Sequence, residues 1–247
     1  MKYKYLLVIA SIFVLFHNLY ANESKLPSQI LNLDHWKLTI PYSLKKGQKK
    51  ASEISQPELN HYQHPIAFLA NKESDGVIFR AHCTDSTTKN SSYPRSELRE
   101  MSIKNETYQK ASWSTTDKTK HIMTLTQAIT STPKVKKHVV SAQIHDEEDD
   151  LLMIRLENKK LFIERNKLNE ILLTDNYQLG EKFNLKIEAF DGHVKVYFND
   201  LLKMDWKISR SNCYFKTGFY TQSNSKKGDS PSSYGEVILY HLDITHE

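Results

Sequence analysis

Alternation of apolar and polar residues dominates this chain of 247 residues from about residue 76 onward, and long amphipathic helical patterns are scarce. Successive side chains of a β-strand point to opposite faces, so each alternating segment can bury one face and leave the other polar. The segments with this pattern are 36–40, 77–81, 95–101, 121–129, 138–145, 151–156, 160–164, 183–189, 193–198, 214–222 and 237–244. Many short strands without a helical layer predict an all-β sandwich of two sheets, in which one concave face can hold an extended ligand.

Turn signals separate several of these segments. Asp191-Gly192 lies between two alternating segments and is a strong signal for a short hairpin. The stretch 53–70 is the one place where we expect a short helix, with Pro57 near its start and with Phe68 and Leu69 packing inward. Internal repeats, low-complexity blocks and linkers are not evident in the sequence.

The first 21 residues have the pattern of a secretory signal peptide. Lys2 and Lys4 supply a positive start, an apolar stretch follows, and Ala21 is a suitable cleavage position. The apolar stretch is shorter than the ~20 residues of a comfortable membrane span. We therefore expect an exported protein, secreted or periplasmic, with one domain over residues 22–247; an uncleaved membrane anchor is the alternative.

The charge balance is mildly basic. The chain has 34 Lys and Arg against 29 Asp and Glu, a net charge of +5, which falls to +3 without the two lysines of the leader. This excess permits an acidic ligand without requiring one, and nucleic acid is not expected in the absence of a basic tail or binding motif. The lysine runs at 45–50 and 134–137 and the acidic run at 146–150 are expected to be solvated turns, since the acidic run lacks the glycine and spacing of an EF-hand loop.

The two cysteines, Cys83 and Cys213, allow only one pairing. An oxidising compartment permits a disulfide, and each cysteine lies beside or within a strand that carries polar candidate residues. We predict one Cys83–Cys213 bridge that braces the site, with two free buried thiols as the alternative. The Cys/His spacing of a zinc site is missing from the sequence, so we expect no metal.

Three strands each gather polar groups on one face. On the segment 138–145, Gln143 and His145 present an amide and an imidazole side by side. Their expected neighbour on that face is Ser141, and the residues expected to face the core are Val140, Ala142 and Ile144. The other two sets are Arg95, Glu97 and Arg99 on one strand, and Lys216, Tyr220 and Gln222 on the other, the latter backed by Phe215 and Phe219.

Each of these residues alone has an ordinary explanation, such as a structural histidine or a surface ladder of ion pairs. Together, the three polar faces can line a groove that binds an anion and moves a proton. The strands offer no obvious pair of carboxylates for glycoside hydrolysis, and the chain has no GxSxG or HExxH motif.

Three blocks resemble the signature blocks of the alginate lyases of polysaccharide lyase family 7, in the order found in that family. They are Tyr93-Pro94-Arg95-Ser96-Glu97-Leu98-Arg99-Glu100, Gln143-Ile144-His145 and Tyr214-Phe215-Lys216-Thr217-Gly218-Phe219-Tyr220-Thr221-Gln222. Trp36-Lys37-Leu38-Thr39-Ile40-Pro41 is similar to the opening strand of the family, so the resemblance covers about residues 32–246. It implies a β-jelly-roll of two antiparallel sheets with a concave groove, and β-elimination without a required metal or other cofactor.

The resemblance also implies roles for individual residues. Arg95 and Gln143 would neutralise the substrate carboxylate, His145 or Tyr220 would remove the proton on C5, and Tyr220 would protonate the departing O4. The residues expected to position groups or bind substrate are Glu97, Arg99, Lys216 and Gln222, with Glu97 as the counter-ion of its two neighbouring arginines. Because a free tyrosine has a pKa near ~10, Tyr220 would need nearby positive charge to act as a base.

The expected activity is cleavage of the anionic polysaccharide alginate by a monomeric protein without stable membrane association. In the resembling family, isoleucine at the middle of the second block accompanies activity on guluronate-containing chains, so Ile144 favours that preference. Two alternatives stay open: a lyase for another polyuronate such as glucuronan, and a non-catalytic module that binds acidic carbohydrate.

Overall fold

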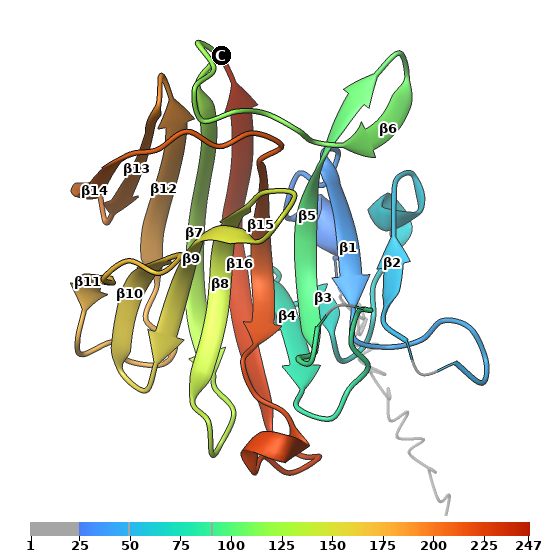
Figure 1. Cartoon of the computed structure of the whole chain (residues 1–247). Helices are drawn as coiled ribbons and strands as arrows, with labels where there is room; N and C mark the ends of the chain where they lie inside the picture. Colours follow the sequence, from blue (N-terminus) through green and yellow to red (C-terminus); the bar gives the residue numbers. More distant parts are fainter. Residues whose placement is uncertain (1–24, 49, 90) are drawn as a thin grey trace, which may run out of the picture.

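The computed structural model describes residues 25–48, 50–89 and 91–247. The predicted signal peptide lies outside the described residues, and it and the single domain stay predictions. The described chain folds into two antiparallel sheets that pack face to face (Figure 1), which confirms the predicted sandwich. Helical structure is confined there to three short 3-10 turns, Pro27–Gln29 (η1), Glu58–His61 (η2) and Ser225–Lys227 (η3). No helix in the described ranges is long and apolar enough to cross a membrane.

Nine strands form one sheet. In spatial order they are β11 (Ile171–Thr174), β10 (Lys160–Arg165), β9 (Asp150–Glu157), β8 (His138–His145), β15 (Tyr214–Thr221), β5 (Arg95–Lys104), β1 (Trp36–Ile40) and β2 (Ser52–Ile54), with β6 (Thr107–Lys110) paired to β5. The three strands predicted to carry the site, β8, β15 and β5, are therefore direct neighbours although they are far apart in the sequence.

Seven strands form the other sheet. Their order is β14 (Leu201–Lys207), β13 (His193–Phe198), β12 (Phe183–Phe190), β7 (His121–Ser131), β16 (Tyr234–His246), β4 (Val77–His82) and β3 (Phe68–Ala70). The predicted hairpin between β12 and β13 is confirmed. Asp191 and Gly192 both have positive φ, 51° and 80°, which matches the right-handed twist of the flanking strands.

The core lies between the two sheets, directly behind the strands of the site. Phe215 and Phe219 of β15 and Leu98 of β5 are completely buried. Phe219 reaches the backbone of Gly235 on β16, where an added Cβ would lie 2.4 Å from the phenyl ring. Burial of a large apolar side chain contributes roughly 1.5–3 kcal/mol, so this layer holds β15 firmly against the second sheet.

A bulge in β8 changes one predicted orientation. The register with β9 shifts between Val140 and Ala142, and the register with β15 shifts at the same level, between Thr217 and Tyr220 of β15. Ser141 lies on the inner face, where its Oγ accepts a hydrogen bond of 3.0 Å from the amide of Gln127 on β7 of the opposite sheet. The prediction that Ser141 shares the polar face was therefore wrong, because a bulge interrupts strict alternation. Beyond the bulge, Ile144 is in the core, as expected.

The short helix predicted within 53–70 is the 3-10 turn η2, which directly follows Pro57, whereas the prediction that Leu69 packs inward was wrong. Only η2 is helical, and the stretch begins in β2 and ends in β3. Phe68 is fully buried, whereas Leu69 is partly exposed, which is the alternation of a strand. β3 forms because it pairs with the exposed edge of β4, a contact that a local helical pattern cannot reveal.

The predicted disulfide is contradicted. Both Cys83 and Cys213 are free and buried, as in the alternative interpretation. Cys213 immediately precedes β15, whereas the Cys83 thiol lies near the hydroxyls of Thr221 and Ser223 at the other end of that strand. Eight residues of strand span ~26 Å, and a disulfide needs Cα atoms within ~7 Å. Burial raises the pKa of both thiols, that of Cys213 to about 12.

Gly218 allows β15 to bulge within the site. Its φ is 120°, and an added Cβ would lie 2.8 Å from both the Phe79 ring and the Ser96 carbonyl oxygen. We expect Gly218→Ala to lower the free energy of unfolding through backbone strain and through overpacking, each of which costs about 1–3 kcal/mol. Gly180→Ala is the matched control, since Gly180 has φ of 92° but open space around it. Denaturant unfolding should show a clearly larger loss of stability for Gly218→Ala than for Gly180→Ala. Equal losses would contradict the close approach of Phe79 and Ser96 to Gly218.

Candidate active site

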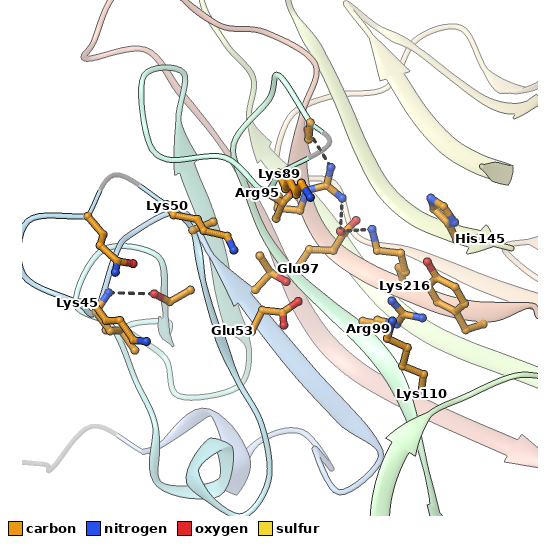
Figure 2. A pocket seen from close by; sticks show the side chains of 18 residues that line it. Lys45, Lys50, Glu53, Lys89, Arg95, Glu97, Arg99, Lys110, His145 and Lys216 are labelled. Atoms are coloured by element: carbon orange, nitrogen blue, oxygen red, sulfur yellow. Dashed lines mark hydrogen bonds and ion pairs between the residues drawn. The ribbon is translucent and has the colours of Figure 1, made fainter. Parts of the chain in front are cut away.

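Register across β8, β15 and β5 brings the predicted site residues together. Lys216 lies at the centre of the face, opposite Arg99 on β5 and Gln143 on β8. On the same three strands, Tyr220 lies opposite Arg95, and Tyr214 lies opposite His145. A groove of about 800 Å³ opens over this face, and Figure 2 shows the side chains that line it.

Glu97 is the hub of the site. Glu97 is only 3% exposed, and one oxygen of its carboxylate contacts Arg95 Nη1 at 3.0 Å and Lys216 Nζ at 2.5 Å (Figure 2). The other oxygen accepts a hydrogen bond from the Gln143 amide. Glu97 is thus a counter-ion, as expected, but its second cation is Lys216, whereas Arg99 was predicted.

Electrostatics keep this hub ionised. Burial raises the pKa of Glu97, but Lys216 and Arg95 together outweigh burial, so that the net pKa lies below its ordinary value. Burial lowers the pKa of Lys216 to about 8, although Glu97 opposes this shift. A carboxylate that stays charged and paired is a poor proton donor or acceptor, so Glu97 orients other groups rather than moving protons.

Arg95 connects the hub to Tyr220. Its guanidinium carbon lies 3.7 Å from the centre of the Tyr220 ring, a cation–π contact. Its Nη2 donates a hydrogen bond of 3.1 Å to Ser91 Oγ, which also lies 3.2 Å from the Tyr220 hydroxyl. Ser91 was missed by sequence reasoning because it lies in a loop, outside any alternating segment. The edge of the Tyr93 ring packs against Tyr220.

His145 is held as a neutral base. Its Nδ1 lies 2.7 Å from the carbonyl oxygen of Asp146. A carbonyl can only accept, so Nδ1 carries the proton and Nε2 keeps a free lone pair. Burial lowers the pKa of His145, which keeps the ring neutral near pH 7. Tyr214, which sequence reasoning did not single out, stacks on the imidazole at 5.3 Å and carries the Arg99 guanidinium 3.8 Å from its ring centre.

The groove is strongly cationic. Lys45, Lys50 and Lys89 reach it from loops, and Lys110 reaches it from β6 (Figure 2). With the two arginines and the lysine of the site, seven cationic side chains line the groove against two carboxylates. Lys45 and Lys50 lie exposed in a loop, as expected, and they also complete this rim. A groove of one charge sign attracts and aligns a polyanion.

The remaining site predictions have different outcomes. Gln143 and Tyr220 contact the lining residues Glu97 and Arg95 without belonging to the lining themselves. Gln222 directly follows β15, is buried, and is not among the described residues that line the groove. Within the described ranges, no group of three or more His, Cys, Asp or Glu side chains could hold a metal ion.

Comparisons with known proteins agree with this site. The family model of the alginate lyases matches residues 31–246. The alginate lyase AlgAT5 from polysaccharide lyase family 7 is 50% identical, with 91% of this chain and 100% of that chain covered and a TM-score of 0.85. The alginate lyase from Corynebacterium sp. is 41% identical, with coverages of 91% and 99% and a TM-score of 0.84. Among functionally curated proteins, no match is found.

The jelly-roll fold, the cationic groove and the similarity to these structures identify the protein as a polysaccharide lyase. The chain belongs to the alginate lyase family.

Proposed function

We propose that the protein is secreted and cleaves the 1,4-glycosidic bonds of alginate by β-elimination. Each cleavage leaves an unsaturated 4-deoxy-uronate at the new non-reducing end. The observation that carries this proposal is the pair of donors, Arg95 and Gln143, held by Glu97 beside a neutral His145 in a cationic groove. The names of the two similar structures, both alginate lyases, support alginate as the substrate.

The first step requires neutralisation of the uronate carboxylate. The proton on C5 is weakly acidic because the adjacent carboxylate already carries negative charge. Glu97 uses one N–H of Arg95 and one of Gln143, so each side chain keeps at least one further N–H for a substrate carboxylate. Donors fixed in advance are most effective where charge develops in the transition state, which here resembles an enolate.

The second step moves two protons. The C5–H bond breaks as its proton passes to Nε2 of His145 or to Tyr220, and a double bond forms between C4 and C5. The C4–O4 bond breaks as the electron pair leaves with O4, which takes a proton from Tyr220. Water is not consumed. Arg95 above the Tyr220 ring supplies the nearby positive charge that a tyrosine needs in this chemistry.

We also propose a preference for guluronate-containing chains, carried by the family resemblance at Ile144. Ile144 is completely buried, so it acts only through the placement of its neighbours Gln143 and His145 on the polar face. Activity on another polyuronate is the second candidate, because the carboxylate and the C5 proton are common to all of these chains.

A panel of substrates tests the function. The protein, treated with EDTA, should release products with the ultraviolet absorbance of unsaturated uronates from polyguluronate, more slowly from polymannuronate, and not from glucuronan. Release from glucuronan alone would assign another substrate. Binding of all three chains without release would favour a carbohydrate-binding module and contradict the proposed activity.

The two shifted pKa values predict a bell-shaped dependence of kcat/KM on pH. As pH falls through the lowered pKa of His145, Nε2 gains a proton and can no longer accept one, so the acid limb should lie below pH 6.5. As pH rises above about 8, Lys216 loses its charge and the hub loses a cation. Lys216→Arg keeps that charge, so its alkaline limb should move to higher pH. An unmoved limb would exclude Lys216 as its cause.

A further inference from the structure

We propose that Ser91 is a positioning residue that turns the hydroxyl proton of Tyr220 into the groove and supports the phenol oxygen once that proton has left. The inference rests on the proposed role of Tyr220 as the proton donor to O4. Ser91 lies in the loop before β5, lines the groove, and bridges Arg95 and Tyr220 through one oxygen atom.

Counting hydrogen bonds at Ser91 Oγ fixes their direction. A hydroxyl accepts at two lone pairs and donates one proton. Arg95 Nη2 and the backbone N–H of Tyr93 each lie 3.1 Å from Oγ, and both groups can only donate. They fill the two lone pairs, so Ser91 has only its proton to offer to the Tyr220 oxygen at 3.2 Å.

This direction leaves the Tyr220 proton uncommitted. Since Ser91 cannot accept it, the proton is free to point toward the groove, where the departing O4 would lie. The Arg95 guanidinium on the ring and the edge-on Tyr93 ring restrict the phenol itself. The oxygen to which Ser91 can donate is therefore the oxygen that donates to substrate.

The same bond gains strength during the reaction. The Ser91 proton has two acceptors within reach, the Tyr93 carbonyl at 3.1 Å and the Tyr220 oxygen at 3.2 Å. When Tyr220 gives its proton away, its oxygen becomes negative, and a hydrogen bond to a charged oxygen is about twice as strong as a neutral one. The Ser91 proton then favours Tyr220, which stabilises the phenolate beside Arg95.

The loop that carries Ser91 has its own anchors. The Asn224 side chain donates to the Ser92 carbonyl at 2.9 Å, and the Thr221 amide donates to the Pro94 carbonyl at 3.1 Å. Neither bond uses the Ser91 hydroxyl, so both still hold the loop in Ser91→Ala, although this variant also loses the contacts of Oγ with the Tyr93 backbone. Ser92→Ala is the matched control, because the Ser92 side chain is exposed and its backbone contact survives the change.

The test compares two substrates. One is oligoguluronate; the other is a uronide whose C4 leaving group is a nitrophenol, which departs without a proton. A hydrogen bond to a charged group contributes about 1.5–3 kcal/mol, so Ser91→Ala should lower kcat on oligoguluronate by about 10–100-fold. Its KM should stay within about twofold, its rate on the nitrophenyl uronide should be nearly unchanged, and Ser91→Thr should restore turnover.

Three results would overturn the role of Ser91. Ser91→Ala that behaves like Ser92→Ala would show that the hydroxyl does nothing in turnover. Equal losses on both substrates would show that Ser91 does not act through the protonation of O4, and failure of Ser91→Thr to restore activity would show a structural role. The proposed function fails separately, if the unchanged protein releases no unsaturated product from oligoguluronate.

Discussion

Replacing Tyr220 with phenylalanine should nearly abolish the release of unsaturated products while affinity for oligouronates survives within about tenfold, or ~1.4 kcal/mol. The change keeps the ring that packs beneath Arg95 and against Tyr93. It deletes the hydroxyl, whose one hydrogen-bond partner among the described residues is Ser91. Proton transfer by a positioned side chain contributes ~10²–10⁴ to the rate. Turnover and calorimetric binding should be measured on the same variant.

Tyr197→Phe provides the control for this change. Tyr197 lies on β13 of the opposite sheet, packed beneath Lys186 and away from the groove. Its replacement should leave turnover unchanged. If Tyr220→Phe also turned over at the original rate, Tyr220 would have no part in the mechanism, and the proton for O4 would have to come from another group.

The second large effect concerns the donors to the substrate carboxylate. Arg95→Ala and Gln143→Ala should each lower kcat by ~10²–10³, because one preorganised donor to developing charge is lost. KM should change less, since neutralisation matters most as C5 loses its proton. Gln143→Ala is the cleaner variant, because Glu97 keeps both of its cations, whereas Arg95→Ala also removes the charge above Tyr220.

Steady-state kinetics on polyguluronate separates the two interpretations of these donors. A rise in KM with kcat intact would mark Arg95 or Gln143 as a binding contact and contradict the assigned role. Gln109→Ala is a suitable control, since Gln109 is an exposed amide on β6 and should leave both constants unchanged.

Alternation was sufficient to predict most of the sheet framework. The bounds of β8 and β13 agree with the predicted segments. β13 alternates between buried and partly exposed residues over its full length, whereas β8 is buried at every position except its two ends. The strands β2, β3 and β6 have three or four residues and form by pairing with the edge of a longer strand. So short a segment carries too little pattern to be recognised.

The site shows the same division. The alternation of strand side chains predicted that Arg95, Glu97 and Arg99 share one face. Which cations contact Glu97, however, depends on the register between neighbouring strands. Gly218 lies opposite Glu97, and Lys216 reaches over from the neighbouring strand. The loop residue Ser91 has no periodic signal at all.

The distance in space between residues far apart in the sequence also could not be predicted. The bridge was predicted because export permits a disulfide and each cysteine lies beside or within a strand of the site, but in the fold Cys83 and Cys213 lie at opposite ends of β15. The rim lysines are the reverse case. Lys45 and Lys50 are solvated loop residues, as predicted, and the loop between β1 and β2 places them at the groove, which their sequence pattern does not reveal.

The most direct test of elimination is the mass of the products formed in water enriched in heavy oxygen. Elimination breaks the C4–O4 bond without consuming water, so the oligouronates from polyguluronate should contain no solvent oxygen apart from that exchanged at the reducing-end aldehyde, which an incubation of uncleaved oligoguluronate measures. Each new non-reducing end should be lighter than a saturated uronate by the mass of one water molecule. Products that carry one heavy oxygen per cleavage and lack the double bond would show hydrolysis and contradict the mechanism built on Arg95, Gln143, His145 and Tyr220.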